Sequence, residues 1–275
     1  MNQVATQKQE SKAGSVFASL TILILVIVGW LIYLFILGNS SNFIEGKVTN
    51  HPVPDGIGHT LGLIYKGGYI VPFLLSFVLM SITFSIERAL TIAKASGKGA
   101  SEEFVRKIKN HLSTGNVGAA MQECDIQTGS VANVMKTALH KYQEMESDSS
   151  MDRDQKVLAI QKEIEEATSL ELPMLEKNLV ILSTMASVST LVALLGTVIG
   201  MIKAFSALST AGAPDSTALA NGISEALINT ALGIFNSAVA IIMYNVFTTR
   251  IDKITYTIDE AGFTIVQNFA AQHKK

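Results

Sequence analysis

The chain has 275 residues, a formal net charge of −2 and only 16% charged residues, whereas 48% of its residues are hydrophobic. Phosphate binding needs a concentrated basic surface, so this charge balance gives no reason to expect a nucleic-acid partner. The single cysteine, Cys124, excludes an internal disulfide and a paired-thiol metal site, and is typical of a small buried residue. The apolar residues come in blocks, which is typical of a membrane protein and not of one soluble domain.

Four windows of the sequence are long and apolar enough to form transmembrane helices. A spanning helix needs roughly 20 mostly apolar residues to cross a hydrocarbon core of about 30 Å. The windows are residues 16–37, 69–86, 179–208 and 219–247. The first is longer than the roughly 7 to 15 apolar residues of a signal peptide, and no clear A-x-A cleavage site follows it. We therefore expect a retained membrane anchor there.

Lysine and arginine are distributed unevenly between the segments that connect these windows. Cytoplasmic segments carry the excess of positive charge, and only Lys47, Lys66 and Lys203 lie away from the two ends and the long middle segment. We therefore expect both termini and the middle segment in the cytoplasm. The predicted organisation is a cytoplasmic tail with the first transmembrane helix (1–38), a periplasmic loop (39–68), a second transmembrane helix (69–92), a cytoplasmic helical domain (93–178), a third transmembrane helix (179–208), a short periplasmic loop (209–218), a fourth transmembrane helix (219–248) and a cytoplasmic C-terminal helix (249–275).

The cytoplasmic segment has the pattern of helices. Ser101 is a candidate N-cap before two acidic residues, and apolar residues follow at helical spacing, at Phe104, Val105, Ile108 and Leu112. A helical stripe from residue 155 to 178 runs into the third window with only Pro173 between them, so we expect one long rod, kinked or locally adjusted at the proline. The predicted fold class is an all-α membrane protein with four transmembrane helices, a helical cytoplasmic domain and long helices extending into the cytoplasm.

The fourth window carries a wide face of small and polar residues. Polar side chains inside a spanning helix are costly, so their angular placement is informative. Glu225, Asn229 and Asn236 fall on one stripe, and Thr230 and Gly233 fall on the neighbouring one. This face predicts a polar, pore-lining interface, with Gly233 as a helix-packing position.

The third window has the same design. Ser187 and Thr197 lie on a small polar stripe, and Gly196 with Gly200 forms a G-x-x-x-G step that lets another helix approach closely. At 1.5 Å per residue from the external ends, Thr197 and Thr230 both lie roughly 14 Å deep, near mid-membrane. Two hydroxyls at one level can hydrate a passing ion or proton. The alternative is that such hydroxyls only bond to backbone carbonyls or join helices.

Glu225 stands apart because a carboxyl group in a span is a functional candidate by default. It lies about 9 Å from the outer end of its helix, where it would concentrate protons near the external mouth of a pore. The alternatives are that it caps the helix or pairs with Lys203. No aspartate or glutamate stands at the membrane centre of any window, so the titrating carboxylate of a proton path would belong to another chain.

No enzyme motif competes with this interpretation. The sequence has no G-x-S-x-G, P-loop or H-E-x-x-H pattern, so neither an enzyme nor a cofactor is predicted. His51 and His59 lie in the 39–66 loop without a cysteine or carboxylate cluster, so they do not predict a metal site.

Two stretches carry a family resemblance. LEKNLVILSTMASVSTLVALLGTVIGMIKAF, followed by ISEALINTALGIFNSAVAIIMYN, resembles the proton-channel family of ExbB, TolQ and MotA, most closely ExbB. The resemblance covers about residues 69–250. It implies that Thr197 and Thr230 are pore threonines and that Glu225 is the family's glutamate of the last span. It also implies a pentamer around the transmembrane helices of a dimeric ExbD-like partner, whose aspartate carries the proton.

The implied function is that of a subunit of a bacterial inner-membrane motor. Such a motor is driven by proton-motive force and passes work to a TonB-like protein that serves outer-membrane transport. A TolQ-like role in envelope maintenance is the alternative within the family, and a secondary transporter or a membrane scaffold is the alternative outside it. A transporter predicts inverted repeats and a self-contained charged site, and the sequence shows neither.

Overall fold

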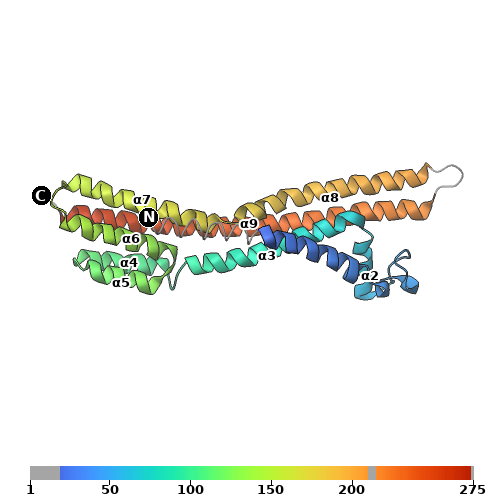
Figure 1. Cartoon of the computed structure of the whole chain (residues 1–275), viewed down its shortest axis with the longest axis horizontal. Helices are drawn as coiled ribbons and strands as arrows, with labels where there is room; N and C mark the ends of the chain where they lie inside the picture. Colours follow the sequence, from blue (N-terminus) through green and yellow to red (C-terminus); the bar gives the residue numbers. More distant parts are fainter. Residues whose placement is uncertain (1–18, 210–214, 274–275) are drawn as a thin grey trace. The chain divides into compact units, whose positions relative to one another are not determined.

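The computed structural model describes residues 19–209 and 215–273, and over these residues it contains helices and no β-strand (Figure 1). The predicted N-terminal tail, half of the predicted 209–218 loop and the last two lysines lie outside the described residues. Four helical stretches are long and apolar enough to cross a membrane, namely Ser19–Leu37, Gly68–Ala95, Arg153–Leu208 and Ser216–Gln272. The predicted all-α membrane fold with four such helices is therefore confirmed.

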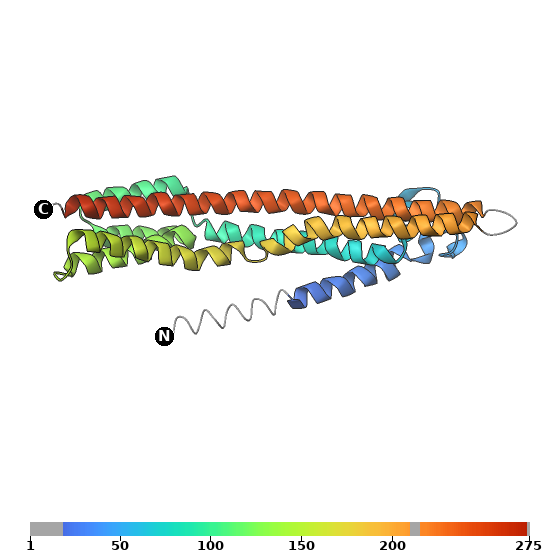
Figure 2. The same ribbon diagram turned by 90° about the horizontal axis from the view of Figure 1, so that it is seen from above.

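The chain divides into two compact units, which are described separately. The first unit comprises Met1–Ser85 and Val180–Tyr244, and the second comprises Ile86–Leu179 and Asn245–Lys275. Three helices contribute to both, α3 (Val71–Ala95), α8 (Leu179–Leu208) and α9 (Ser216–Gln272). Figure 2 shows α9 as one unbroken helix, so the predicted fourth span and the predicted C-terminal helix are a single element.

The first unit begins with the apolar helix Ser19–Leu37, whose end Ile32–Leu37 is a π-helix. The short 3₁₀ turns η2 (Ser40–Asn42) and η3 (Ile44–Gly46) follow. The Asn42 side-chain amide donates hydrogen bonds to the carbonyls of Ile36, at 2.8 Å, and Leu37, at 3.0 Å. These are carbonyls at the end of a helix, which have no partner within it, so Asn42 closes the helix end.

The segment that we predicted as a periplasmic loop contains the helix α2 (Gly56–Tyr65). The ring of Tyr65 stacks on that of Tyr33, with centroids 4.6 Å apart, and holds α2 against the first helix. A Cβ atom at Gly62 would lie only 2.8 Å from the Asn42 carbonyl oxygen, so a glycine is required where α2 crosses the preceding turn. A further 3₁₀ turn, η4 (Gly68–Ile70), leads into α3.

Helices α8 and α9 pack with their backbones in close contact in the first unit. A Cβ atom at Gly200 would lie 2.7 Å from the Ala226 nitrogen, and one at Gly222 would lie 2.7 Å from the Ala204 nitrogen. Glycine at both positions allows this approach, which larger side chains would prevent. The structure also places Gly196 against Asn229 and Gly233 against α8.

The second unit is a bundle of amphipathic helices, α4 (Ser101–Ser113), α5 (Val117–Gln127), α6 (Gly129–Ser147) and α7 (Arg153–Glu176), packed in chain order. The predicted apolar stripe of α4 is confirmed, because Phe104, Val105, Ile108 and Leu112 are all buried. The predicted N-cap at Ser101 is wrong by one residue: Ala100 occupies the cap position and makes no side-chain cap bond.

The C-terminal end of α9 belongs to the core of the second unit. The Tyr142 hydroxyl lies within hydrogen-bonding distance of two amide oxygens of α9, at 3.1 Å from Asn268 and 3.0 Å from Gln272. Gln272 in turn donates to the Leu112 carbonyl at 2.6 Å. These bonds join α4, α6 and α9 at one end of the bundle.

The predicted rod formed by α7 and the third span is interrupted, and not at Pro173. The proline lies inside α7, and the helix ends three residues later, where Lys177 leaves the helical region and Asn178 has a positive φ of 64°. Asparagine tolerates this left-handed conformation better than most residues. The prediction was wrong because proline removes one hydrogen bond near a helix end, whereas Lys177 and Asn178 turn the backbone itself.

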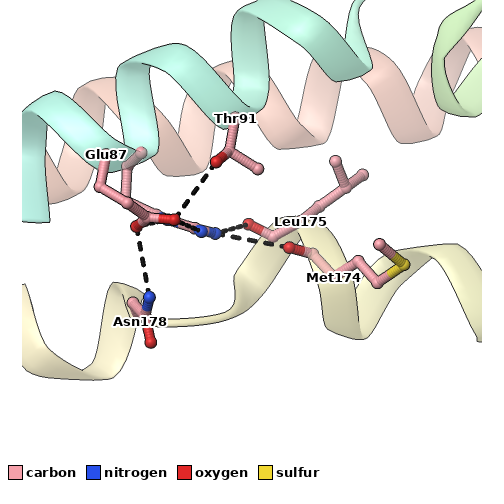
Figure 3. A network of polar contacts seen from close by, with 6 residues as sticks. Glu87, Thr91, Met174, Leu175 and Asn178 are labelled. Carbon is pink, nitrogen blue, oxygen red and sulfur yellow. Dashed lines mark hydrogen bonds and ion pairs between the residues drawn. The ribbon is translucent and has the colours of Figure 1, made fainter. Parts of the chain in front are cut away.

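A network of polar contacts surrounds this break (Figure 3). The last carbonyls of α7 have no donor in their own helix, and Arg88 Nη1 donates to those of Leu175, at 3.2 Å, and Met174, at 3.4 Å. The Glu87 carboxylate accepts from Arg88 Nε at 2.7 Å and from Asn178 Nδ2 at 3.2 Å. The guanidinium thus caps the negative end of α7, and Glu87 fixes the residue at which the helix breaks.

We expect Cys124 of α5 to resist alkylation in the folded protein. Burial raises the pKa of its thiol to about 12, and the Asp125 carboxylate adds to the shift, so almost no thiolate exists near neutral pH. A maleimide should therefore label the unfolded chain and leave the native chain unlabelled. Ser113→Cys, at an exposed position of α4, is the positive control. Rapid labelling of native Cys124 would contradict the buried placement.

Candidate functional site

The structure brings Thr197 of α8 and Thr230 of α9 together in the first unit. Their hydroxyl oxygens lie 2.5 Å apart, and both side chains are partly exposed. The Thr197 oxygen also lies 3.1 Å from the Ala193 carbonyl, and the Thr230 oxygen 3.0 Å from that of Ala226. Each hydroxyl has one proton, so one threonine donates to the other while the second donates to its own helix. The pair can exchange these roles by rotating its hydroxyl protons alone.

An open, mostly apolar groove of about 580 Å³ begins at Thr197. It continues along the next turns of α8, and its walls include Met201, Ile202 and Phe205. A hydroxyl at the end of such a groove can be reached by a side chain of another helix. The threonine pair therefore differs from hydroxyls that only bond to the carbonyls of their own helix.

Glu225 is paired with Lys203, which was one of the alternatives left open by the sequence. The ammonium group lies 2.6 Å and 2.8 Å from the two carboxylate oxygens. The Glu225 side chain is only 10% exposed, whereas that of Lys203 is 43% exposed. The Lys203 nitrogen also lies 5.2 Å from the centre of the Tyr69 ring, within cation–π range. The one carboxylate of this site is therefore neutralised within the chain.

Asn229 and Asn236 lie between helices of the same chain and are buried. Asn229 donates to the Gly67 carbonyl at 2.9 Å, and Asn236 donates to the Ser189 hydroxyl at 2.6 Å. Ser189 was not singled out from the sequence, although it lies seven residues before Gly196 on the same helical stripe. These contacts hold α9 to its neighbours, and a pore-lining role for either asparagine stays a prediction.

The remaining predicted positions are not brought to the threonine pair. Ser187 is exposed on α8 and bonds to the Ser183 carbonyl of its own helix at 3.5 Å. His59 lies 2.7 Å from the Val53 carbonyl. Within residues 19–209 and 215–273, no group of three or more histidine, cysteine or acidic residues is arranged to hold a metal ion.

Comparison with known proteins finds a family match for the part of the sequence that carries these residues. Residues 127–260 match the profile of the MotA/TolQ/ExbB proton channel family, and this match includes both the threonine pair and the Lys203–Glu225 pair. This region belongs to the MotA/TolQ/ExbB proton channel family. Together with the four apolar helices, the match makes the chain a multi-pass membrane protein.

Relatives with two different names match the chain. The Tol-Pal system protein TolQ of Pseudomonas aeruginosa is 32% identical over 120 residues, which are 44% of this chain and 52% of that protein. TolQ of Haemophilus influenzae is 42% identical over 88 residues, 32% of this chain and 39% of that protein. The biopolymer transport protein ExbB of Salmonella typhimurium is 29% identical over 85 residues, 31% of this chain and 35% of that protein. The chain spans about half the length of these relatives or less.

Proposed function

We propose that the chain is an ExbB-like subunit of an inner-membrane motor driven by proton-motive force. With an ExbD-like single-span partner it conducts protons and energises a TonB-like protein for outer-membrane transport. Both termini lie in the cytoplasm, and the chain forms a homo-oligomer, by family resemblance a pentamer. The observation that carries the proposal is the contact of 2.5 Å between Thr197 and Thr230 at the end of an open groove.

The division of labour with a partner follows from the charges of the two helices. Lys203 is the only charged residue of α8, and Glu225 is the only one of α9 between residues 216 and 249. Because these two neutralise each other, the spanning part of this helix pair offers no unpaired acid to a proton. A titrating carboxyl group must come from another chain, and the groove beside Thr197 gives a partner helix access to this member of the threonine pair.

Neutral hydroxyls suit this task. A hydroxyl donates a hydrogen bond to an ionised carboxylate and accepts one from the protonated acid. The threonine pair can serve both states by rotating its protons, since its two oxygens already share one hydrogen bond. The partner's acid is thereby solvated in either state without being held by a fixed opposite charge.

The proposal predicts that Thr197→Val and Thr230→Val each reduce partner-dependent proton flux in liposomes by about tenfold or more. A lost hydrogen bond of about 1.4 kcal/mol at the rate-limiting barrier corresponds to that factor. Valine keeps the volume and removes the hydroxyl, whereas Thr→Ser at the same positions keeps the hydroxyl and is the matched control. The wild-type chain without its partner should conduct poorly.

Three results would count against the assignment. Full flux in both valine variants would remove the threonines from the path, and rapid flux from this chain alone would contradict the need for a partner. Loss of the oligomer in the valine variants, measured by native mass spectrometry, would assign the hydroxyls to helix packing.

A TolQ-like role is the second candidate, because the identity to TolQ of Haemophilus influenzae, 42%, exceeds that to ExbB of Salmonella typhimurium, 29%. The two roles differ in what the motor serves. Restoration of outer-membrane integrity in a strain lacking TolQ, without restoration of energised uptake in a strain lacking ExbB, would favour the TolQ-like role.

A further inference from the structure

We propose that Lys203 is a positioning residue that holds Glu225 in a charge clamp and keeps this carboxylate out of the proton path. The inference rests on the proposed function and gives Glu225 a role different from that of a proton collector at the pore mouth. It follows from the contacts of the pair, the burial of its two members and the chain segment packed against it.

The contacts of Glu225 leave its carboxylate little freedom. Both oxygens accept from the same ammonium group, at 2.6 Å and 2.8 Å. Gly68 lies directly beside the carboxylate, and it has a positive φ of 76° that favours glycine. A carboxylate that is 10% exposed and covered on one side by backbone is poorly placed to exchange protons with water.

A second contact fixes the turn around Gly68, which lies beside the Glu225 carboxylate. One helical turn after Glu225, Asn229 donates to the carbonyl of Gly67, the residue before Gly68. Tyr69, the residue after Gly68, places its ring near Lys203. The clamp therefore joins three segments, α8 through Lys203, α9 through Glu225 and the turn that leads into α3. Two phenols accompany the pair: that of Tyr69, whose ring lies beside Lys203, and that of Tyr33, which interacts electrostatically with Glu225.

The unequal burial of the two members predicts unequal consequences when either is removed. Lys203→Met would leave a carboxylate that is 90% buried without its cation, which is strongly unfavourable. Glu225→Gln would leave an ammonium group that is 43% exposed and sits on a flexible stem that can reach water. The lysine variant should therefore be the more damaging, although the family resemblance draws attention to the glutamate.

The test is a double-mutant cycle with two readouts. For the purified full chain in detergent, without any partner, we expect Lys203→Met to lower the thermal midpoint by about 5 °C or more. We expect Glu225→Gln to lower it by less than half as much, and the double variant Lys203→Met/Glu225→Gln to recover most of the loss. In liposomes with an ExbD-like partner, Glu225→Gln and the double variant should retain flux within about twofold, with an unchanged dependence on pH.

The outcomes distinguish a charge-paired Glu225 from a Glu225 that carries protons. Loss of flux in Glu225→Gln at an unchanged thermal midpoint would overturn the clamp and make Glu225 a proton carrier. A double variant no more stable than Lys203→Met would also overturn it, because the two charges would then be uncoupled. If the wild-type chain with its partner conducts no protons, the proposed function fails, and the thermal cycle still decides whether the clamp exists.

Discussion

Arg88→Met is expected to destabilise the second unit by about 3–5 kcal/mol, which is a large share of the stability of an ordinary domain. The Arg88 side chain is 2% exposed and donates to the carbonyls of Met174 and Leu175, which lie in the last turn of α7, where carbonyls have no donor within the helix. Methionine fills similar space but leaves the buried Leu175 carbonyl without its donor, at a cost of about 1–3 kcal/mol. It also removes the cation that is paired with Glu87.

The loss in free energy of unfolding is measured by denaturant titration, with a spectroscopic signal from the second unit as the readout. Amide hydrogen exchange at residues 174–179 shows where the structure is weakened. Arg106→Met is the matched control, since Arg106 is exposed on α4 and its removal should change the free energy of unfolding by less than about 0.5 kcal/mol. Arg88→Lys should lie between the two, because an ammonium group keeps the charge but lacks the planar fork. If the Arg88 and Arg106 variants were equally stable, the capping role of Arg88 would be refuted.

Gly200→Ala is expected to separate α8 from α9 and to lower the stability of the first unit by about 1–3 kcal/mol or more, although it adds a single methyl group. The new Cβ atom would lie 2.7 Å from the Ala226 nitrogen and 2.8 Å from the Gly222 carbonyl oxygen. Both are backbone atoms of a neighbouring chain segment and cannot move aside as the end of a flexible side chain can. The helices must shift, and the contact between Thr197 and Thr230 should be lost with them.

Gly118→Ala is the control: it adds the same methyl group, but we expect it to raise the stability and not to lower it. Gly118 lies in α5, where the nearest atom to an added Cβ is Asn116 Oδ1 at 3.8 Å, so alanine should stabilise that helix by about 0.5–1 kcal/mol. Thermal midpoints compare the two variants. Disulfide formation between Thr197→Cys and Thr230→Cys reports the α8–α9 contact, because the native Cys124 is buried. Efficient cross-linking in the Gly200→Ala background would show that the helix pair tolerates the methyl group.

The sequence by itself determined the number of apolar helices and the inward faces of several. Apolar length is a local property, so the windows near residues 16–37 and 69–86 could be found without knowing what packs against them. The stripe of α4, including Ile108 and Leu112, could likewise be predicted, because helical periodicity follows from the backbone alone. Small residues such as Gly200 indicated a close helix approach, although not which atoms would meet.

Only the tertiary structure decided which polar side chains pair with one another. Helix α7 ends at Glu176 and the backbone turns at Lys177 and Asn178, not at Pro173. Glu87 and Arg88, about 90 positions earlier in the sequence, satisfy the polar groups that this break exposes. Lys203 reaches Glu225 across 22 positions, which turns a candidate proton carrier into a charge-paired residue. Helical periodicity places a side chain on a face of its own helix, but it leaves free the rotation and the depth of one helix against another. Those two variables determine which polar groups meet inside a membrane protein.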